Sequence, residues 1–324
     1  MRRPKVNMER PARFAQRRPW VWSALGALAV WAALSIISGR GVLTSLEAAF
    51  ELGAFLALIG LGQLFVITSG NGNIDLSLPN IITLSGYIGV GAMGGLHGSV
   101  ARGVLLGLGV GIAVAIANVA AIMVLGIPPI VATLSVGLLV QSFVLSEASN
   151  FNGQAPNGAH AFMTDRLVGG IPLIGVLAVL ATVVGAVLLH RTKFGREVQA
   201  VGQNLAAAKL SGIRVTRVVV GCYLISGFLA AVVGVGLSVF TGPSPTLGDP
   251  YLLESVGVVV LGGSLIAGGQ SNISGVWGAA FFLNLVITLC LVLHLSVALQ
   301  YVVEGILIIA VLSLAGGKRW AASG

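Results

Sequence analysis

The chain has 324 residues, of which 9% are charged and 56% hydrophobic, with a mean hydropathy of +0.99 and a net charge of +8. A soluble domain needs about a quarter of its residues charged to cover its surface. This composition therefore excludes an ordinary soluble enzyme and indicates an all-α integral membrane protein surrounded by lipid.

Apolar stretches between polar breaks predict about ten transmembrane helices. They are expected near residues 20–38, 51–69, 77–93, 103–125, 128–146, 171–190, 217–239, 253–267, 273–293 and 296–315. At 1.5 Å per residue, each is near the length that crosses a bilayer core of about 30 Å, except the third and the eighth, which are short. The first is long for a signal-peptide core and is expected to be a retained helix.

The positive charge is clustered beside these apolar stretches. Of 18 Lys and Arg residues, seven lie in 2–18, six in 191–217 and two at 318–319. An even number of expected helices separates each cluster from the next, so all three can face the cytoplasm of a bacterial inner membrane, with 147–170 outside. This distribution is typical of membrane topology and gives no reason to expect a nucleic-acid partner.

The predicted organisation is simple. A basic cytoplasmic N-terminus (1–18) precedes a single transmembrane domain (19–317) and a short cytoplasmic tail (318–324). No sequence repeat is evident, but two halves of five helices would have opposite orientations, as in many transporters.

The longest polar insertion on the predicted inner side is 191–217. Its good helix formers, Glu197–Val201 and Leu205–Leu210, are punctuated by Gly202 and Gly212, which we expect to act as breaks. From the residues alone, the insertion is either a short helix lying across the cytoplasmic face or a solvated loop that carries topogenic charges.

The insertion also carries a recognisable motif. Its segments Thr192–Arg196 (TKFGR), Ala200–Asn204 (AVGQN), Ala206–Ala208 and Leu210–Ile213 (LSGI) resemble the cytoplasmic loop of ribose-type carbohydrate ABC permeases. That family is related to the branched-chain amino-acid permeases.

Three further stretches are similar to the same family: Ile74–Ser77 (IDLS), Pro128–Leu134 (PPIVATL) and the glycine-rich Leu261–Ser264 with Val276–Gly278. The resemblance extends over about residues 50–315. The chain departs from the pattern at Asn73, at Pro79 and at 270–272.

The resemblance implies a type II-like ABC importer permease. Its expected partners are ABC ATPase subunits, a periplasmic or extracellular sugar-binding protein, a second permease copy and the lipid bilayer. The chain has no GxxxxGK[ST] phosphate loop. We therefore expect ATP to be bound by the partner, with no cofactor, metal or catalytic residue in this chain.

In such permeases the loop holds a coupling helix that docks on the ATPase. Small residues would allow close approach, while Phe194 would serve as an apolar plug and Arg196 as a charged hydrogen-bonding group. The residues expected to form this coupling loop are Phe194, Gly195, Arg196, Gly202, Asn204, Ala207, Gly212 and Ile213.

A second candidate region surrounds Asp75. The breakers in Ser69–Asp75 cannot continue a helix in lipid, so this segment lies either inside the bundle or at the inner surface as a simple loop. Polar residues elsewhere in the spans can equally be helix-to-helix hydrogen bonds. The candidate pathway or hinge residues are Asn71, Asn73, Asp75, Ser77, Thr133, Gln300 and Glu304.

Two other functions remain open from the sequence, a secondary transporter and a passive facilitator. Ion coupling would need a cluster of intramembrane carboxylates, for which Asp75 and Glu304, with Glu51 and Glu254 near span ends, are available. The residues do not identify the solute, and ribose, xylose, arabinose, galactose, fructose or an autoinducer-like furanose would all fit the resemblance.

Overall fold

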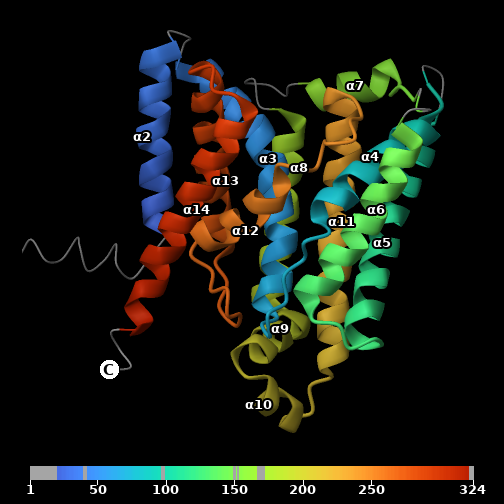
Figure 1. Ribbon diagram of the computed structural model, residues 1–324, viewed down its shortest axis with the longest axis vertical. Helices are drawn as coiled ribbons and strands as arrows, with labels where there is room; N and C mark the ends of the chain where they lie inside the picture. The colour runs from blue at the N-terminus through green and yellow to red at the C-terminus, as the bar shows by residue number, and fades with distance from the viewer. Residues whose placement is uncertain are drawn as a thin grey trace, which may run out of the picture.

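The computed structural model describes residues 20–38, 42–95, 99–148, 151, 153–165 and 172–320, so the basic segment 1–18 lies outside the described residues. Helices dominate this part of the chain (Figure 1). They are α2 (Trp20–Ser38), α3 (Val42–Thr68), α4 (Leu78–Met93), α5 (Val100–Met123), α6 (Pro129–Ala148), α7 (Asn157–Thr164), α8 (Leu173–Arg191), α9 (Lys193–Gln203), α10 (Leu205–Leu210), α11 (Val215–Thr241), α12 (Tyr251–Leu261), α13 (Ile273–Val292) and α14 (Val297–Trp320).

The apolar helices account for the composition. Six of the described helices, namely α3, α5, α6, α8, α11 and α13, contain stretches long and apolar enough to cross a membrane. Shorter apolar stretches lie in α2, α4, α12 and α14. These elements fall on the stretches that the sequence predicts as spans, and the chain is a multi-pass membrane protein.

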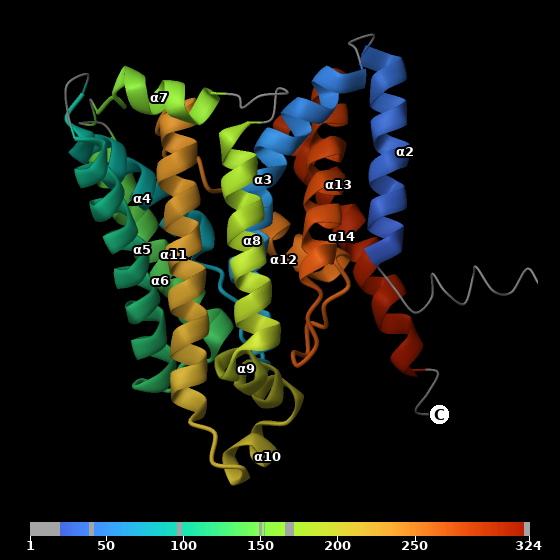
Figure 2. The same cartoon turned by 180° about the vertical axis from the view of Figure 1, so that it is seen from behind.

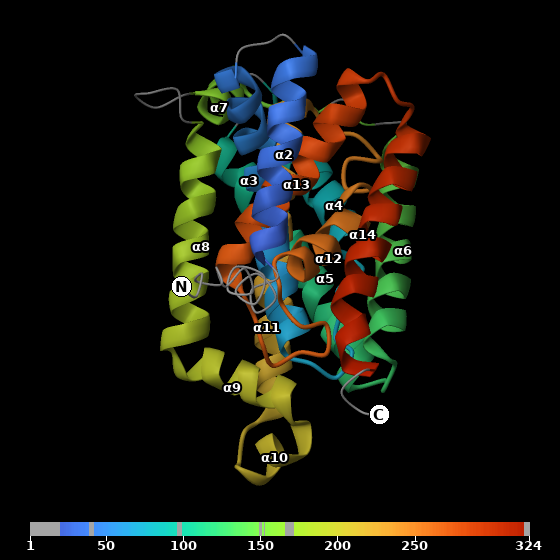
Figure 3. The same ribbon diagram turned by 90° about the vertical axis from the view of Figure 1, so that its left-hand side faces the viewer.

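Two long helices, α3 and α11, form the centre. Each has 27 residues, they pack against each other, and their buried side chains include Phe55, Phe65 and Tyr223. Helices α4 and α5 pack on α11, whereas α12 and α13 pack on α3. Helix α2 covers α13 and α8 covers α3, as the views from behind and from the side show (Figures 2 and 3).

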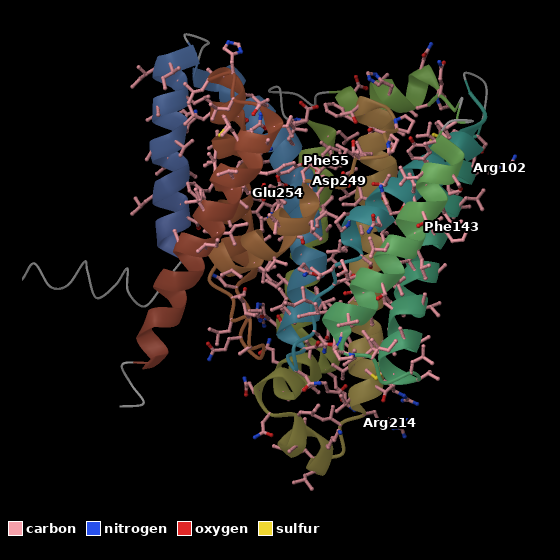
Figure 4. All side chains as sticks on the ribbon, in the orientation of Figure 1. Phe55, Arg102, Phe143, Arg214, Asp249 and Glu254 are labelled. Atoms are coloured by element: carbon pink, nitrogen blue, oxygen red, sulfur yellow. The ribbon has the colours of Figure 1, made fainter. Side chains whose placement is uncertain are left out.

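Close backbone contact holds these helices together. A Cβ added at Gly111 of α5 would overlap the carbonyl oxygen of Gly227 on α11, and one added at Gly227 would lie 2.9 Å from the Cβ of Ala115. Such approach lets backbones pack without large side chains between them. On the outside, α6 presents apolar side chains such as Phe143, which is 66% exposed and points away from the bundle (Figure 4).

Each central helix ends in a break of the same length. Residues 69–77 join α3 to the 16-residue α4, and 242–250 join α11 to the 11-residue α12. The first break opens with three consecutive left-handed residues, Gly70, Asn71 and Gly72, at φ 69°, 56° and 73°. Asn tolerates this conformation better than most residues, so the helix stops here and the chain turns back into the bundle.

Several boundaries differ from the predicted ones. Helix α3 begins at Val42, ahead of the predicted span near 51–69, but its apolar stretch Ala49–Thr68 coincides with that span. Helix α12 ends at Leu261 rather than near 267, because Gly262 and Gly263 follow and Gly263 has φ 87°. The predicted outer segment 147–170 contains an unpredicted short helix, α7.

The polar elements gather at opposite ends. Helix α7 lies across one end of the bundle, while α9 and α10 project from the other (Figures 1 and 3). Arg102 lies toward the α7 end and Arg214 toward the α10 end (Figure 4). This separation agrees with the charge pattern of the sequence.

Candidate functional site

The first break is built around a buried carboxylate. Asp75 has no exposed surface. Its Oδ1 accepts hydrogen bonds from the backbone N–H of Ser77 (3.0 Å) and the Ser77 hydroxyl (2.6 Å), and its Oδ2 accepts one from the hydroxyl of Ser226 on α11 (3.0 Å). The amide of Asn118 on α5 donates to the Ser77 hydroxyl (2.7 Å). Asp75 also precedes the N-terminus of α4, whose dipole favours a negative charge.

The backbone of the break is anchored on two more helices. The N–H of Asp75 donates to the Oε1 of Gln63 on α3 (3.3 Å), and that of Leu76 donates to the hydroxyl of Thr133 on α6 (3.1 Å). These bonds satisfy the groups that an unwound segment exposes, which lipid could not do. Residues 73–77 are therefore packed inside the bundle, whereas Asn71 and Gly72 are exposed.

Three of the predicted pathway residues, Asp75, Ser77 and Thr133, are brought together by these bonds, and Asn73 lies in the same break with separate partners. Asn73 is buried, and its Nδ2 donates to the Ser69 hydroxyl (3.0 Å). Asn71, two residues earlier, is exposed.

The second break docks on the start of α4. The N–H of Gly248 donates to the hydroxyl of Thr83 (3.1 Å), and a Cβ on Gly248 would overlap the carbonyl oxygen of Pro79. The amide of Gln141 on α6 donates to the carbonyl oxygen of Pro245 (3.2 Å). Both breaks therefore contact α6.

Two other predicted residues, Gln300 and Glu304, lie apart from Asp75, on α14. Glu304 is buried, as is Glu254 on α12, and α12 packs against α14. The Nε2 of Gln300 donates to the carbonyl oxygen of Leu295, within its own end of the chain (3.0 Å). Figure 4 shows Glu254 and Asp249 in the middle of the molecule.

The polar insertion 191–217 forms two helices rather than one. Thr192 caps α9 by accepting from the N–H of Gly195 (3.2 Å), and Asn204 caps α10 by accepting from the N–H of Ala207 (3.0 Å). The expectation that Gly202 breaks the helix is wrong, because α9 continues through it to Gln203. The two helices are separated at Asn204, whose side-chain oxygen accepts from the Ala207 N–H, a group that has no partner within α10.

Gly202 has a different role, since it lies at a junction of three segments. A Cβ there would overlap the carbonyl oxygen of Thr68, at the end of α3, and would lie 2.9 Å from the Cα of Gly269. The N–H of Gly269 donates to the same Thr68 oxygen (2.9 Å), and Gln203 donates to the Gly269 carbonyl (3.3 Å). The end of α9 is thus fixed directly against the start of the first break.

Phe194 is turned inward rather than toward a partner. Its ring stacks with Phe65 of α3 at 6.5 Å and lies over Gly221 of α11. Ile213 is also packed on the core. These two apolar residues anchor the insertion to the bundle.

The outward surface of the insertion is formed by other residues. Arg196, Asn204, Ala207 and Gly212 are exposed, whereas Gly195 is buried, where it allows the tight turn from α8 into α9. The sequence analysis missed Leu210, which is 90% exposed at the end of α10. The sequence signal that could have indicated it is an apolar residue next to Lys209 within a polar insertion.

A broken helix buried in a multi-pass bundle and fixed to a pair of projecting helices is typical of the membrane-spanning part of a transporter. The chain belongs to the family described as the branched-chain amino acid transport system / permease component, whose family model matches residues 45–312. This confirms the family resemblance found in the sequence.

Individual relatives agree. The ribose import permease protein of Bacillus subtilis (strain 168) is 34% identical over 260 residues, which are 79% of this chain and 80% of the relative. The autoinducer 2 import system permease protein of Enterobacter sp. (strain 638) is 29% identical over 301 residues, 89% of this chain and 86% of the relative. The fructose import permease protein of Rhizobium meliloti is 32% identical over 232 residues, 68% and 64% of the two chains. No solved structure matches the chain.

Proposed function

We propose that this chain is the membrane-spanning permease subunit of a binding-protein-dependent ABC importer in a bacterial cytoplasmic membrane. In this proposal it translocates a monosaccharide inward, while partner ATPase subunits bind and hydrolyse ATP and an external protein delivers the sugar. The sugar class is supported by relatives named for ribose and fructose import. The solute then passes by transient hydrogen bonds, with no chemistry in this chain.

The observation that carries the proposal is the pair of projecting helices α9 and α10. A coupling element needs an outward surface for a partner and a rigid inner contact with the moving part. Leu210, Arg196 and Ala207 supply the surface, and the junction of Gly202 with Thr68 supplies the contact. Displacement of α9 would therefore be transmitted to the break that holds Asp75.

We further propose ten spans in two inverted halves of five. The support is the recurrence of a 27-residue helix, a break of equal length and a short helix, in α3–α4 and again in α11–α12. The packing is also reciprocal, since α3 contacts α12 and α13 while α11 contacts α4 and α5. A second permease copy would complete the transporter and would cover part of the exposed apolar surface of α6 and α14.

One observation favours a rival function, an ion-driven secondary transporter. Glu254 and Glu304 are both buried, on helices that pack against each other, and ion coupling would require intramembrane carboxylates of this kind. This rival predicts uptake that follows a proton or sodium gradient and needs no ATPase.

Reconstitution separates the two. The chain is co-expressed with the ATPase subunit of a ribose-type ABC importer. ATP-dependent uptake of labelled ribose and fructose is then measured in proteoliposomes with a sugar-binding protein. Co-purification of the ATPase and uptake that requires ATP support the importer. Uptake by the chain alone, driven by an imposed ion gradient, would refute it.

A further inference from the structure

A cavity of about 350 Å³ lies between the first break and helix α10, at the inner end of the bundle. The polar and charged residues of its lining are Ser69, Asn71, Asn73, Lys209 and Thr216. Ser69 and Asn73 are buried, whereas the Lys209 side chain reaches the cavity from the exposed face of α10. Its volume is in the range of small-ligand sites.

The rest of the lining is mostly apolar. It includes Ile122 and Met123, at the end of α5, and Val219, near the start of α11. Immediately beside it Val124 and Leu125 are 80% and 71% exposed, in the turn between α5 and α6. The apolar part of the lining therefore continues onto exposed apolar residues at the same end of the bundle.

The electrostatics of the cavity favour an anion. Lys209 is the charged residue of the lining, and no carboxylate belongs to the lining. In the described part of the chain no acid forms an ion pair with Lys209. Glu197, the acid of the insertion, pairs instead with Lys193, with 3.8 Å between its Oε1 and the Lys193 Nζ. Residues 191–217 carry six Lys and Arg against that one acid. A single ammonium with amides and hydroxyls around it matches a phosphate that carries hydroxyl groups.

We propose that this cavity binds a phosphate-bearing, hydroxyl-rich group, with the phosphate at Lys209 and the hydroxyls at Asn71, Asn73 and Thr216. Two sources share this chemistry: the headgroup of an anionic phospholipid, whose chains would lie on the apolar part of the lining, and a soluble sugar phosphate on the cytoplasmic side. An occupant holds α10 against the first break. On the function proposed above, such an occupant regulates the movement that ATP hydrolysis drives.

Binding is measured on the purified full chain, without ATPase or ATP. Native mass spectrometry counts bound phosphatidylglycerol against phosphatidylcholine, and calorimetry measures ribose 5-phosphate against ribose. The test variant is Lys209→Gln. The matched control is Lys193→Gln, which removes the same charge from the same insertion but does not line the cavity. Asn71→Asp, which places a negative charge on the wall in a conformation that Asp tolerates, is the second test.

The expected result is binding of one phosphate probe, weakened roughly tenfold or more by Lys209→Gln and by Asn71→Asp and unchanged by Lys193→Gln. Preference for phosphatidylglycerol identifies a lipid occupant, and binding of ribose 5-phosphate identifies a soluble one. Failure of both probes to bind, or equal effects of the two lysine variants, overturns the inference. Failure of the chain to assemble with an ATPase would refute the proposed function but leave this binding result standing.

Discussion

Substitution of Gly202 by alanine tests whether α9 transmits movement to the first break. The added methyl group would overlap the Thr68 carbonyl oxygen and lie 2.9 Å from the Cα of Gly269. Both neighbours are backbone, so no flexible side chain can move aside and α9 itself must shift. Overpacking of this kind costs about 1–3 kcal/mol, which is less than the roughly 5–15 kcal/mol by which folded proteins are typically stable. The protein should insert and purify, with coupling between ATP hydrolysis and uptake impaired.

The assay compares ATP turnover and sugar uptake in the reconstituted complex, together with thermal unfolding in detergent. The control is Gly109→Ala, because a Cβ at Gly109 meets nothing within 4 Å and the helix gains a better former. A Gly202→Trp variant should show the same defect more strongly. If Gly202→Ala retains the wild-type ratio of uptake to hydrolysis, the junction does not transmit force and the coupling argument fails.

Three further outcomes follow from the same structure. Cysteine placed at Asn157 should be labelled from outside intact cells, and cysteine at Gln203 only after permeabilisation; labelling of Gln203 from outside contradicts the proposed topology. Asp75→Asn should reduce uptake severalfold without preventing insertion, because charged hydrogen bonds are about twice as strong as neutral ones. The matched control is Asp249→Asn, which changes an exposed acid of the second break. Equal uptake by the two variants would show that the Asp75 carboxylate is dispensable. Leu210→Glu should weaken ATPase co-purification by about tenfold or more, since burying an exposed Leu is worth about 1.5–3 kcal/mol, and unchanged co-purification would place the partner elsewhere.

Much of the fold could be predicted from apolar length and charge. The polar insertion 191–217 was found because its composition differs so strongly from its surroundings, and the stretches expected to span coincide with the apolar helices. Helix ends were harder to predict. Helix α12 ends at Leu261 because two glycines follow, and hydropathy alone does not register that effect. Helix α3 begins at Val42, ahead of its apolar stretch, where hydropathy gives no signal.

Side-chain direction could not be predicted. From the sequence, the Phe194 side chain could equally pack into a groove of a partner or against the bundle. Its ring stacks on Phe65 and lies over Gly221, which has no side chain, so it packs inward. The recurrence of α3–α4 in α11–α12 was also invisible, because it is a repeat of lengths and packing rather than of residue identity.

Because of the location of Asp75, a small movement of α9 would affect several helices of the bundle. Unwound backbone inside a membrane domain needs a polar partner for each freed group, and here Gln63 of α3 and Thr133 of α6 accept from the backbone N–H groups of Asp75 and Leu76. Ser226 of α11 donates to the Asp75 carboxylate. The break directly follows Thr68, the last residue of α3, whose carbonyl is in contact with α9. A shift of α9 must therefore either stretch these bonds or carry the helices with it. Because an unsatisfied buried group costs about 1–3 kcal/mol, moving the helices together is the less costly response.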